Sequence, residues 1–256
     1  MKKITLSIFS IFFSFAAMAS GGDNNGDSLI NKNDNLNNEL SVANTAQSGA
    51  SPDFPGSLVV EFGFNFLNDH PEDMELGFFG SKAFNVYYMY EFQLGNSPFS
   101  FNPGFGIGLE KYAFDKNVTL GRTAEGAVAL NELPETWDVK KTKLAANYFD
   151  IPLELRFHLN KNNFRKSFKI AVGGKAGVLF DGHTKIKYKS DGDTKIVKEK
   201  ESFELSRFRY GVQGRIGIGG FSLFYYQELS ELFKDGEGPE ATAATPFKVG
   251  LSLALF

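Results

Sequence analysis

The 256-residue chain contains no cysteine, so no disulfide bond can stabilise its fold and no lipid-modified cysteine can anchor it. Its formal net charge is only −3, which argues against nucleic-acid binding, because a nucleic-acid-binding domain presents a basic face. Beyond residue 19, no apolar run approaches the roughly 18 residues that a membrane-spanning helix needs. These absences exclude a disulfide-stabilised scaffold, a lipoprotein of the usual kind, a nucleic-acid-binding protein and a helical membrane protein.

The first 19 residues have the features of a secretory signal peptide. Lys2 and Lys3 form the basic start, and residues 4–17 are apolar but too short to span a bilayer. Ala17 and Ala19 frame a small-x-small cleavage site. An uncleaved N-terminal anchor is the alternative interpretation. Residues 1–19 therefore predict export of the chain.

Residues 20–56 are rich in Asn, Asp, Ser and Gly. This composition buries too little apolar surface to offset the entropy of ordering the chain, so we expect a disordered linker. Pro52 and Pro55 close it. Residues 57–256 remain as one folded domain.

Aromatic residues make up 15% of the chain, and Phe and Tyr favour pleated strands. Residues 148–159 show the pattern best, because every second residue from Phe149 onward is apolar and polar residues stand between them. One face of such a strand is hydrocarbon and the other carries charge. The apolar face packs inward in a soluble protein, whereas it meets lipid in a transmembrane barrel.

The same alternation recurs along the chain. We expect strands at residues 58–66, 84–94, 99–114, 148–159, 168–180, 208–218, 221–229 and 247–256. Short turns follow the second, fourth and sixth strands, and long connections, one of them spanning residues 115–143, follow the first, third, fifth and seventh. This rhythm predicts an all-β fold, namely an eight-stranded antiparallel up-and-down transmembrane β-barrel in the bacterial outer membrane.

A soluble, lipocalin-like barrel with the two faces exchanged is the alternative. Phe and Tyr side chains would then fill the interior and leave at most a small ligand cavity. The position of Phe256 at the end of a strand favours the membrane barrel, because outer-membrane barrels end in this way. We expect a monomer surrounded by outer-membrane lipid.

If the apolar faces look outward, acids and bases share the interior. We expect it to hold Glu61, Glu91, Glu110, Asp150, Glu154, Asp181, Glu228, Arg156, Lys169, Lys175, Arg207, Arg209, Arg215 and Lys248. The two signs balance, and side chains just fill the lumen of an eight-stranded barrel. Because unpaired buried charges are costly, we predict a plug of ion pairs and no open pore.

A lysine-rich ribbon is expected between the fifth and sixth strands, because Asp191-Gly192 is a hairpin signal. It carries Lys185, Lys187, Lys189, Lys195, Lys198 and Lys200. These charges could hold lipopolysaccharide phosphates at the cell surface. The alternative is a solvated hairpin, since acids are interspersed with the lysines.

No catalytic, cofactor-binding or metal-binding residues are predicted. His158 falls at the short-turn end, and His70 and His183 fall on the loop side without an evident serine nucleophile. Gly104, Gly106 and Gly108 recur at every second residue, which indicates small side chains on one strand face rather than a nucleotide loop.

Residues 148–156, Y-F-D-I-P-L-E-L-R, precede a glycine-rich strand at residues 171–177. This arrangement resembles the PorT-like outer-membrane β-barrel family of Bacteroidota, which belongs with the OmpA-like eight-stranded barrels. The resemblance covers residues 57–256 and implies a link to type IX protein secretion for some members. It implies no catalytic residues, and the Asn-rich linker and the lysine ribbon depart from the family pattern.

These features together predict a barrel with a structural or interaction role in the cell envelope. Its loops would contact envelope proteins or lipopolysaccharide. The alternatives are an envelope-assembly or type IX secretion accessory, a narrow transporter of small apolar molecules, and a lipid-modifying enzyme.

Overall fold

The computed structural model describes residues 56–160, 163, 166–190 and 192–255. The expected signal peptide, almost all of the expected linker, and Phe256 lie outside the described residues. Within the described part of the chain, no helix combines the length and the apolar character needed to cross a membrane.

The described residues form strands and two short 3₁₀ helices. In chain order the elements are β1 (Ser57–Asn68), η1 (Glu72–Met74), β2 (Lys82–Met89), β3 (Phe92–Gln93), β4 (Phe99–Phe114), β5 (Val118–Arg122), β6 (Val128–Glu132), β7 (Asp138–His158), β8 (Phe168–Ser190), β9 (Asp193–Glu199), β10 (Phe208–Ile218), β11 (Phe221–Glu228), η3 (Pro239–Ala241) and β12 (Thr245–Leu255).

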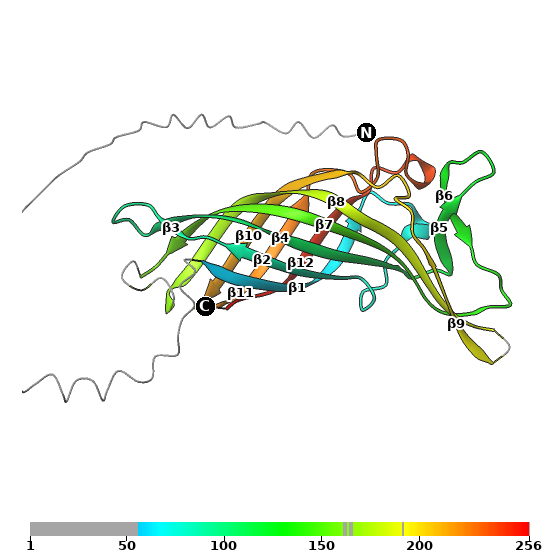
Figure 1. The fold of residues 1–256 in the computed structure, drawn as a ribbon, viewed down its shortest axis with the longest axis horizontal. Coiled ribbons are helices and arrows are strands. Elements are labelled where there is room, and N and C mark those ends of the chain that lie inside the picture. Colours follow the sequence, from blue (N-terminus) through cyan, green and yellow to red (C-terminus); the bar gives the residue numbers. More distant parts are fainter. Residues whose placement is uncertain (1–55, 161–162, 164–165, 191, 256) are drawn as a thin grey trace, which may run out of the picture. The chain divides into compact units, whose positions relative to one another are not determined.

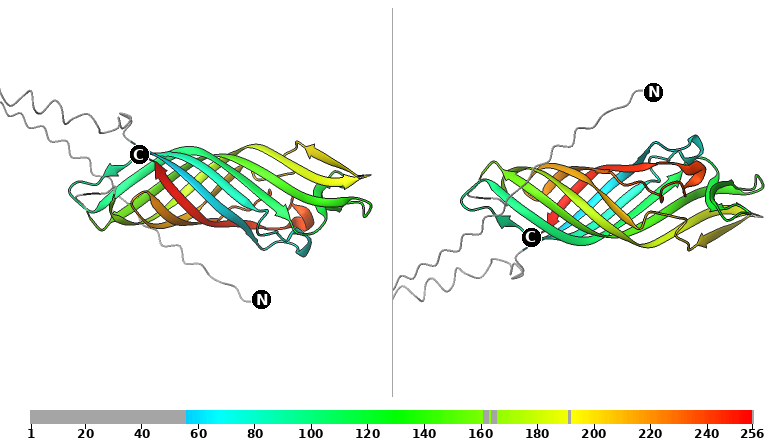
Figure 2. Two further views of the ribbon diagram at one scale, coloured as in Figure 1. Left: turned by 90° about the horizontal axis from the view of Figure 1, so that it is seen from below. Right: turned by 90° about the horizontal axis from the view of Figure 1, so that it is seen from above.

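Eight of these strands form a closed antiparallel ring in the order β1, β2, β4, β7, β8, β10, β11, β12. The ring closes between β12 and β1, whose pairing is continuous from Leu58 opposite Leu255 to Asn68 opposite Thr245. The strands cross the barrel at a slant, as closure of a sheet requires (Figure 2). The predicted eight-stranded antiparallel barrel is confirmed.

The apolar face of the ring points outward. Phe149, Ile151 and Leu153 of β7 are exposed, whereas Tyr148 and Asp150 between them are buried. The same alternation holds on the other ring strands, so a continuous apolar belt surrounds a polar interior. The alternative soluble barrel with exchanged faces is therefore wrong.

Two ring strands extend well beyond the belt. β7 has 21 residues and β8 has 23, whereas a transmembrane strand needs about 9–11. Figure 1 shows β5, β6 and β9 gathered at the end of the barrel to which β7 and β8 extend, and β3 at the opposite end. Because outer-membrane barrels have short periplasmic turns and long outer loops, we take the extended end as extracellular.

The prediction of a long loop at residues 115–143 is wrong. It contains the β5–β6 hairpin and the start of β7. Lys141 and Lys143 occupy the outward positions of this part of β7, beside the buried Thr142 and Leu144. The alternation was hidden because outward residues above the lipid are charged instead of apolar.

A bulge interrupts the pairing of β7 with β8. Tyr148 pairs with Leu179 and Asn147 pairs with Asp181, so Phe180 is an extra residue on β8. Below the bulge, Lys169 and Lys175 are buried, and beyond it the even-numbered residues are buried instead. One inserted residue thus exchanges the two faces of β8.

The membrane orientation predicts a depth-dependent cost for charge on the outer face. Replacement Leu153→Arg, in the middle of the apolar outer face of β7, should destabilise the barrel by about 2–4 kcal/mol in a bilayer, and Leu159→Arg, just past the end of β7, by about 0–1 kcal/mol. Denaturant unfolding in lipid vesicles measures both. Equal, small effects at the two positions would contradict immersion of the belt in lipid.

Candidate functional site: the barrel interior and its cap

Inward side chains change in character along the barrel. On β7, Thr142, Leu144, Ala146 and Tyr148 face inward at the extracellular end, and Asp150, Glu154, Arg156 and His158 follow toward the short-turn end. The interior therefore has an apolar extracellular layer above two ionic layers and a polar rim.

Arg209 of β10 lies at the centre of the upper ionic layer. Its guanidinium forms a two-point ion pair with Asp150 of β7, with Nε–Oδ1 at 3.0 Å and Nη2–Oδ2 at 2.7 Å. Its Nη1 also donates to Glu110 of β4 at 3.1 Å and to Glu228 of β11 at 3.2 Å. The side chain is 1% exposed and lies 3.8 Å above the ring of Tyr148.

Two buried lysines balance the remaining charge in this layer. Lys248 of β12 contacts Glu110, and its Nζ lies 3.9 Å from Glu228. Lys175 of β8 donates to the hydroxyl of Tyr87 at 3.1 Å, and that hydroxyl donates to Asp150 at 2.9 Å. Three acids and three bases thus fill one cross-section of the lumen, in which a lone charge would be costly.

Glycines make the space that Arg209 occupies. A Cβ on Gly108 would lie 2.5 Å from Arg209 Nη2 and 2.7 Å from Asp150 Oδ2. A Cβ on Gly177 would overlap the same carboxylate. Gly108 of β4 and Gly177 of β8 thus mark the place where a long side chain crosses the lumen.

Arg215 of β10 organises the lower ionic layer. Its Nη2 lies 2.7 Å from Glu61 and 2.8 Å from Glu154, and its Nη1 donates to Ser252 Oγ. Arg156 holds the second oxygen of Glu154 at 2.8 Å. Asn85 donates to Glu61 at 2.9 Å, so both carboxylates are bonded on both oxygens.

A polar cluster lies at the rim of the short-turn end. His158 Nε2 is 3.1 Å from Glu91 and 3.0 Å from Ser100 Oγ, and Ser100 itself donates to Glu91 at 2.9 Å. Sequence reasoning did not pair this serine with a histidine. A catalytic triad places the serine and the acid on opposite ring nitrogens, whereas here both meet the same one. Lys169 is buried nearby on β8.

Three residues expected in the interior lie elsewhere. Arg207 is exposed because it precedes the first residue of β10, and its guanidinium lies 5.9 Å from the ring of Phe208. Asp181 lies past the β8 bulge, beside Asn147 at 2.8 Å and His183 at 2.9 Å. Glu91 lies at the rim with its side chain 34% exposed.

An apolar cluster closes the extracellular end, and the sequence analysis did not anticipate it. The residues come from β-strands and from all four extracellular connections: Leu67, Met74, Tyr112, Phe114, Val118, Leu120, Val128, Leu144, Ala146, Tyr148, Phe203, Leu205, Leu232 and Phe233. We call this cluster and the loops that supply it the cap. It packs like a soluble core because this part of the barrel stands above the lipid.

Ion pairs tie the outer surface of the cap together. Glu204 lies 3.0 Å from Arg122 of β5 and 2.6 Å from Lys234 of the β11–β12 connection. Hydrogen bonds from Lys234 and Arg122 lower the pKa of Glu204 below its usual value of 4.5. Phe203 and Glu204 adopt left-handed backbone conformations, with φ of 47° and 53°, a strained arrangement that the burial of Phe203 holds in place.

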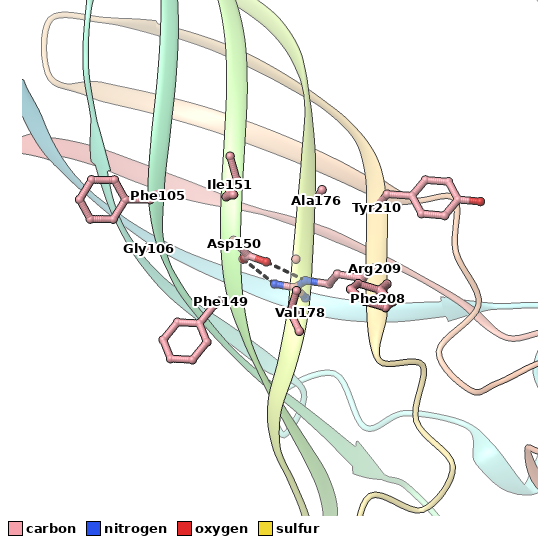
Figure 3. Close-up of a pocket in the computed structure, with 11 residues that line it drawn as sticks. Phe105, Gly106, Phe149, Asp150, Ile151, Ala176, Val178, Phe208, Arg209 and Tyr210 are labelled. Carbon is pink, nitrogen blue, oxygen red and sulfur yellow. Dashed lines mark hydrogen bonds and ion pairs between the residues drawn. The ribbon is translucent and has the colours of Figure 1, made fainter.

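A groove of about 380 Å³ indents the outer wall between β4, β7, β8 and β10. Figure 3 shows the rings of Phe105, Phe149, Phe208 and Tyr210 around it. Gly106, Ala176 and Gly177 leave the wall thin here. The Asp150–Arg209 pair lies directly behind this wall, so the upper ionic layer of the lumen stands behind the groove.

The predicted ribbon is formed by the end of β8 and by β9, with Lys185 opposite Lys198 and Tyr188 opposite Lys195. Lys187, Lys189, Lys195, Lys198 and Lys200 are exposed, and Lys185 is half-buried. Among the residues that the structure describes, no group of histidines and carboxylates is arranged to hold a metal ion.

Comparison with known families gives one match. Residues 45–234 match the family model described as outer membrane protein beta-barrel domain. No curated protein matches the chain. The matched residues include the ring strands from β1 to β11 and most of the cap.

Removal of the central cation should leave three carboxylates against two lysines. We expect Arg209→Met to destabilise the barrel by about 3–5 kcal/mol, because breaking a buried ion pair leaves an uncompensated charge. Arg207→Met, two residues earlier and exposed, should change stability by less than about 0.5 kcal/mol. Denaturant unfolding in vesicles tests both. Equal effects would show that the upper ionic layer does not stabilise the barrel.

The cap should loosen when Glu204 loses its charge. Because its folded-state pKa is lowered, its ion pairs stabilise the cap fully above pH 4.5, and this contribution is lost as the pH falls through the folded-state pKa. Amide hydrogen exchange at Phe203 and Leu205, expressed relative to the intrinsic exchange rate at each pH, should accelerate in Glu204→Gln at pH 7 and in the wild type at acidic pH. The exposed neighbour Glu237→Gln serves as control, and acceleration there of equal size would refute the assignment.

Proposed function

The chain belongs to the outer membrane protein beta-barrel domain family, and on that premise we propose that it is a non-conducting barrel with a structural or interaction role in the bacterial outer membrane. The barrel anchors the protein in the membrane, and the cap presents a folded surface to the cell exterior.

The blocked lumen is the observation that carries this proposal. Arg209 alone bonds to carboxylates on three other strands, β4, β7 and β11. Arg215 joins β1 and β7 one layer below, and the apolar cluster closes the extracellular end. A solute would have to displace all three layers in turn, and the buried charges make displacement of the two ionic layers costly.

The fixed shape of the cap supports an interaction role. Thr142 Oγ1 donates to the carbonyl of Val118 at 2.6 Å and so ties β7 to the β5–β6 hairpin. Thr242 Oγ1 donates to the carbonyl of Asp69 at 3.0 Å and joins two other extracellular connections. A surface whose loops are fixed to one another loses little entropy when it binds a partner.

Within the family, we propose that the chain is PorT-like and exported by its signal peptide, as in Bacteroidota. The motif at residues 148–156 supports this placement, because its Asp150, Glu154 and Arg156 supply both ionic layers from a single strand. An accessory role in envelope assembly or type IX secretion is the second candidate. Crosslinking from residues 20–56 to periplasmic proteins tests it.

The groove in the outer wall favours one further alternative, a narrow path for small apolar molecules. Such a path would have to pass the Asp150–Arg209 pair. Liposome flux of a small apolar probe, compared between the wild type and Ala176→Phe, separates the two functions, because a filled groove reduces flux only where the groove conducts.

A measurement of ion conductance tests the proposal directly. The wild-type barrel should give no sustained conductance in planar bilayers, whereas a 16-stranded porin in the same bilayers should conduct. Heat-modifiable mobility of the same preparation verifies that the barrel is folded. Sustained, voltage-independent steps from the folded barrel would overturn the proposed function.

A further inference from the structure

A row of lysines crosses the outer wall at the upper edge of the apolar belt. Lys82 of β2 is paired with Lys111 of β4. Lys143 of β7 is paired with Lys185 of β8, which is paired with Lys198 of β9. These five residues, together with Lys141 and Lys187 one step further out, are called the lysine face.

All members of the lysine face point away from the barrel axis. Lys111 precedes the buried Tyr112, Lys143 lies between the buried Thr142 and Leu144, and Lys185 precedes the buried Ile186. Lys143 lies within electrostatic reach of Lys82, Lys111, Lys141 and Lys185. Neighbouring lysines repel one another, so a grouping of this kind favours an anionic partner.

The protein supplies little counter-charge on this face. Among the described residues, no carboxylate forms an ion pair with Lys111, Lys143 or Lys185. The nearby Asp181 is held by Asn147, His183 and Lys200, and Asp138 is held by Lys140 at 2.6 Å. On the ribbon, the acids Asp193 and Glu199 pair opposite Ser190 and Thr184, which places them on the other face.

The lysine face meets hydrocarbon immediately below. On β2 the next outward residue after Lys82 is Phe84, and on β4 the next after Lys111 is Leu109. Lys82 Nζ lies 5.6 Å from the ring of Phe62, so the lysine face directly adjoins the apolar belt. This level is the boundary between acyl chains and headgroups in the outer leaflet.

We propose that the lysine face binds the phosphate groups of an anionic glycolipid of the outer leaflet. The charges match the phosphates, and the apolar belt below matches the acyl chains of the same molecule. A free phosphate ion would use the charges but not the belt, so the position of the lysines favours the lipid. The proposal extends the predicted ribbon site along the wall to β2, β4 and β7, and it corrects that site at Lys195, which lies opposite the buried Tyr188 and so on the other face. It is independent of whether the lumen conducts.

Binding of purified lipid A to the full-length barrel in nanodiscs tests the proposal. Lys143→Gln/Lys185→Gln should bind bisphosphorylated lipid A about thirty-fold more weakly, at about fivefold per lysine near a membrane surface. Lipid A without phosphates should bind the wild type and this variant equally. The control Lys166→Gln/Lys195→Gln removes the same charge from the short-turn end and from the opposite ribbon face, and it should bind like the wild type.

Each remaining outcome counts against the proposal. Equal binding of phosphorylated and dephosphorylated lipid A to the wild type would overturn it, and so would an equal loss in the control variant. Competition by millimolar inorganic phosphate would assign the face to a free anion instead of a lipid. Heat-modifiable gel mobility of both variants shows that they are folded, which substitution of lysines outside the barrel interior should not alter.

Discussion

The buried guanidinium of Arg209 is the interaction on which the rest of the structure depends. A barrel that presents hydrocarbon to lipid on its outer face must hold its polar groups inside, where each charge needs a partner. Arg209 meets this need for Asp150, Glu110 and Glu228 at once. Because these acids come from β7, β4 and β11, one side chain of β10 joins its neighbour β11 to β7 and β4, which do not pair with β10, and Gly108 leaves the space for it.

Tyr148 lies at the boundary between the ionic and the apolar layers of the interior. One face of its ring lies 3.8 Å from the guanidinium of Arg209, and the residue also belongs to the apolar cluster of the cap. The interior changes from ionic to apolar at this level because the strands leave the lipid there. Above it, water surrounds the barrel and hydrophobic burial again favours folding. The cap is therefore built like the core of a soluble protein.

Period-two alternation predicted the ring because lipid outside and charge inside act on every membrane-spanning residue. It set the bounds of β4 and β10 correctly and placed Asp150, Glu154, Arg209 and Arg215 inside. It failed where that constraint ends. The start of β7 lies above the lipid, where outward lysines obscure a strand, and Arg207 precedes β10 and so escapes its alternation. The ion-pair partner of each charged residue could not be predicted from the sequence either, because it depends on contacts across the lumen.

The bulge at Phe180 determines which lysines are inside and which are outside. Odd-numbered residues of β8, such as Lys175, face inward before the bulge, and the same parity faces outward after it, as at Lys185. Without the extra residue, Lys185 and Lys187 would point toward the cap cluster, where their charges would be buried among apolar side chains at high cost. One inserted residue therefore lets a single strand supply a cation to the ionic core and a row of cations to the membrane surface. Sequence alternation alone cannot locate such an insertion, which is why Asp181 was assigned to the interior.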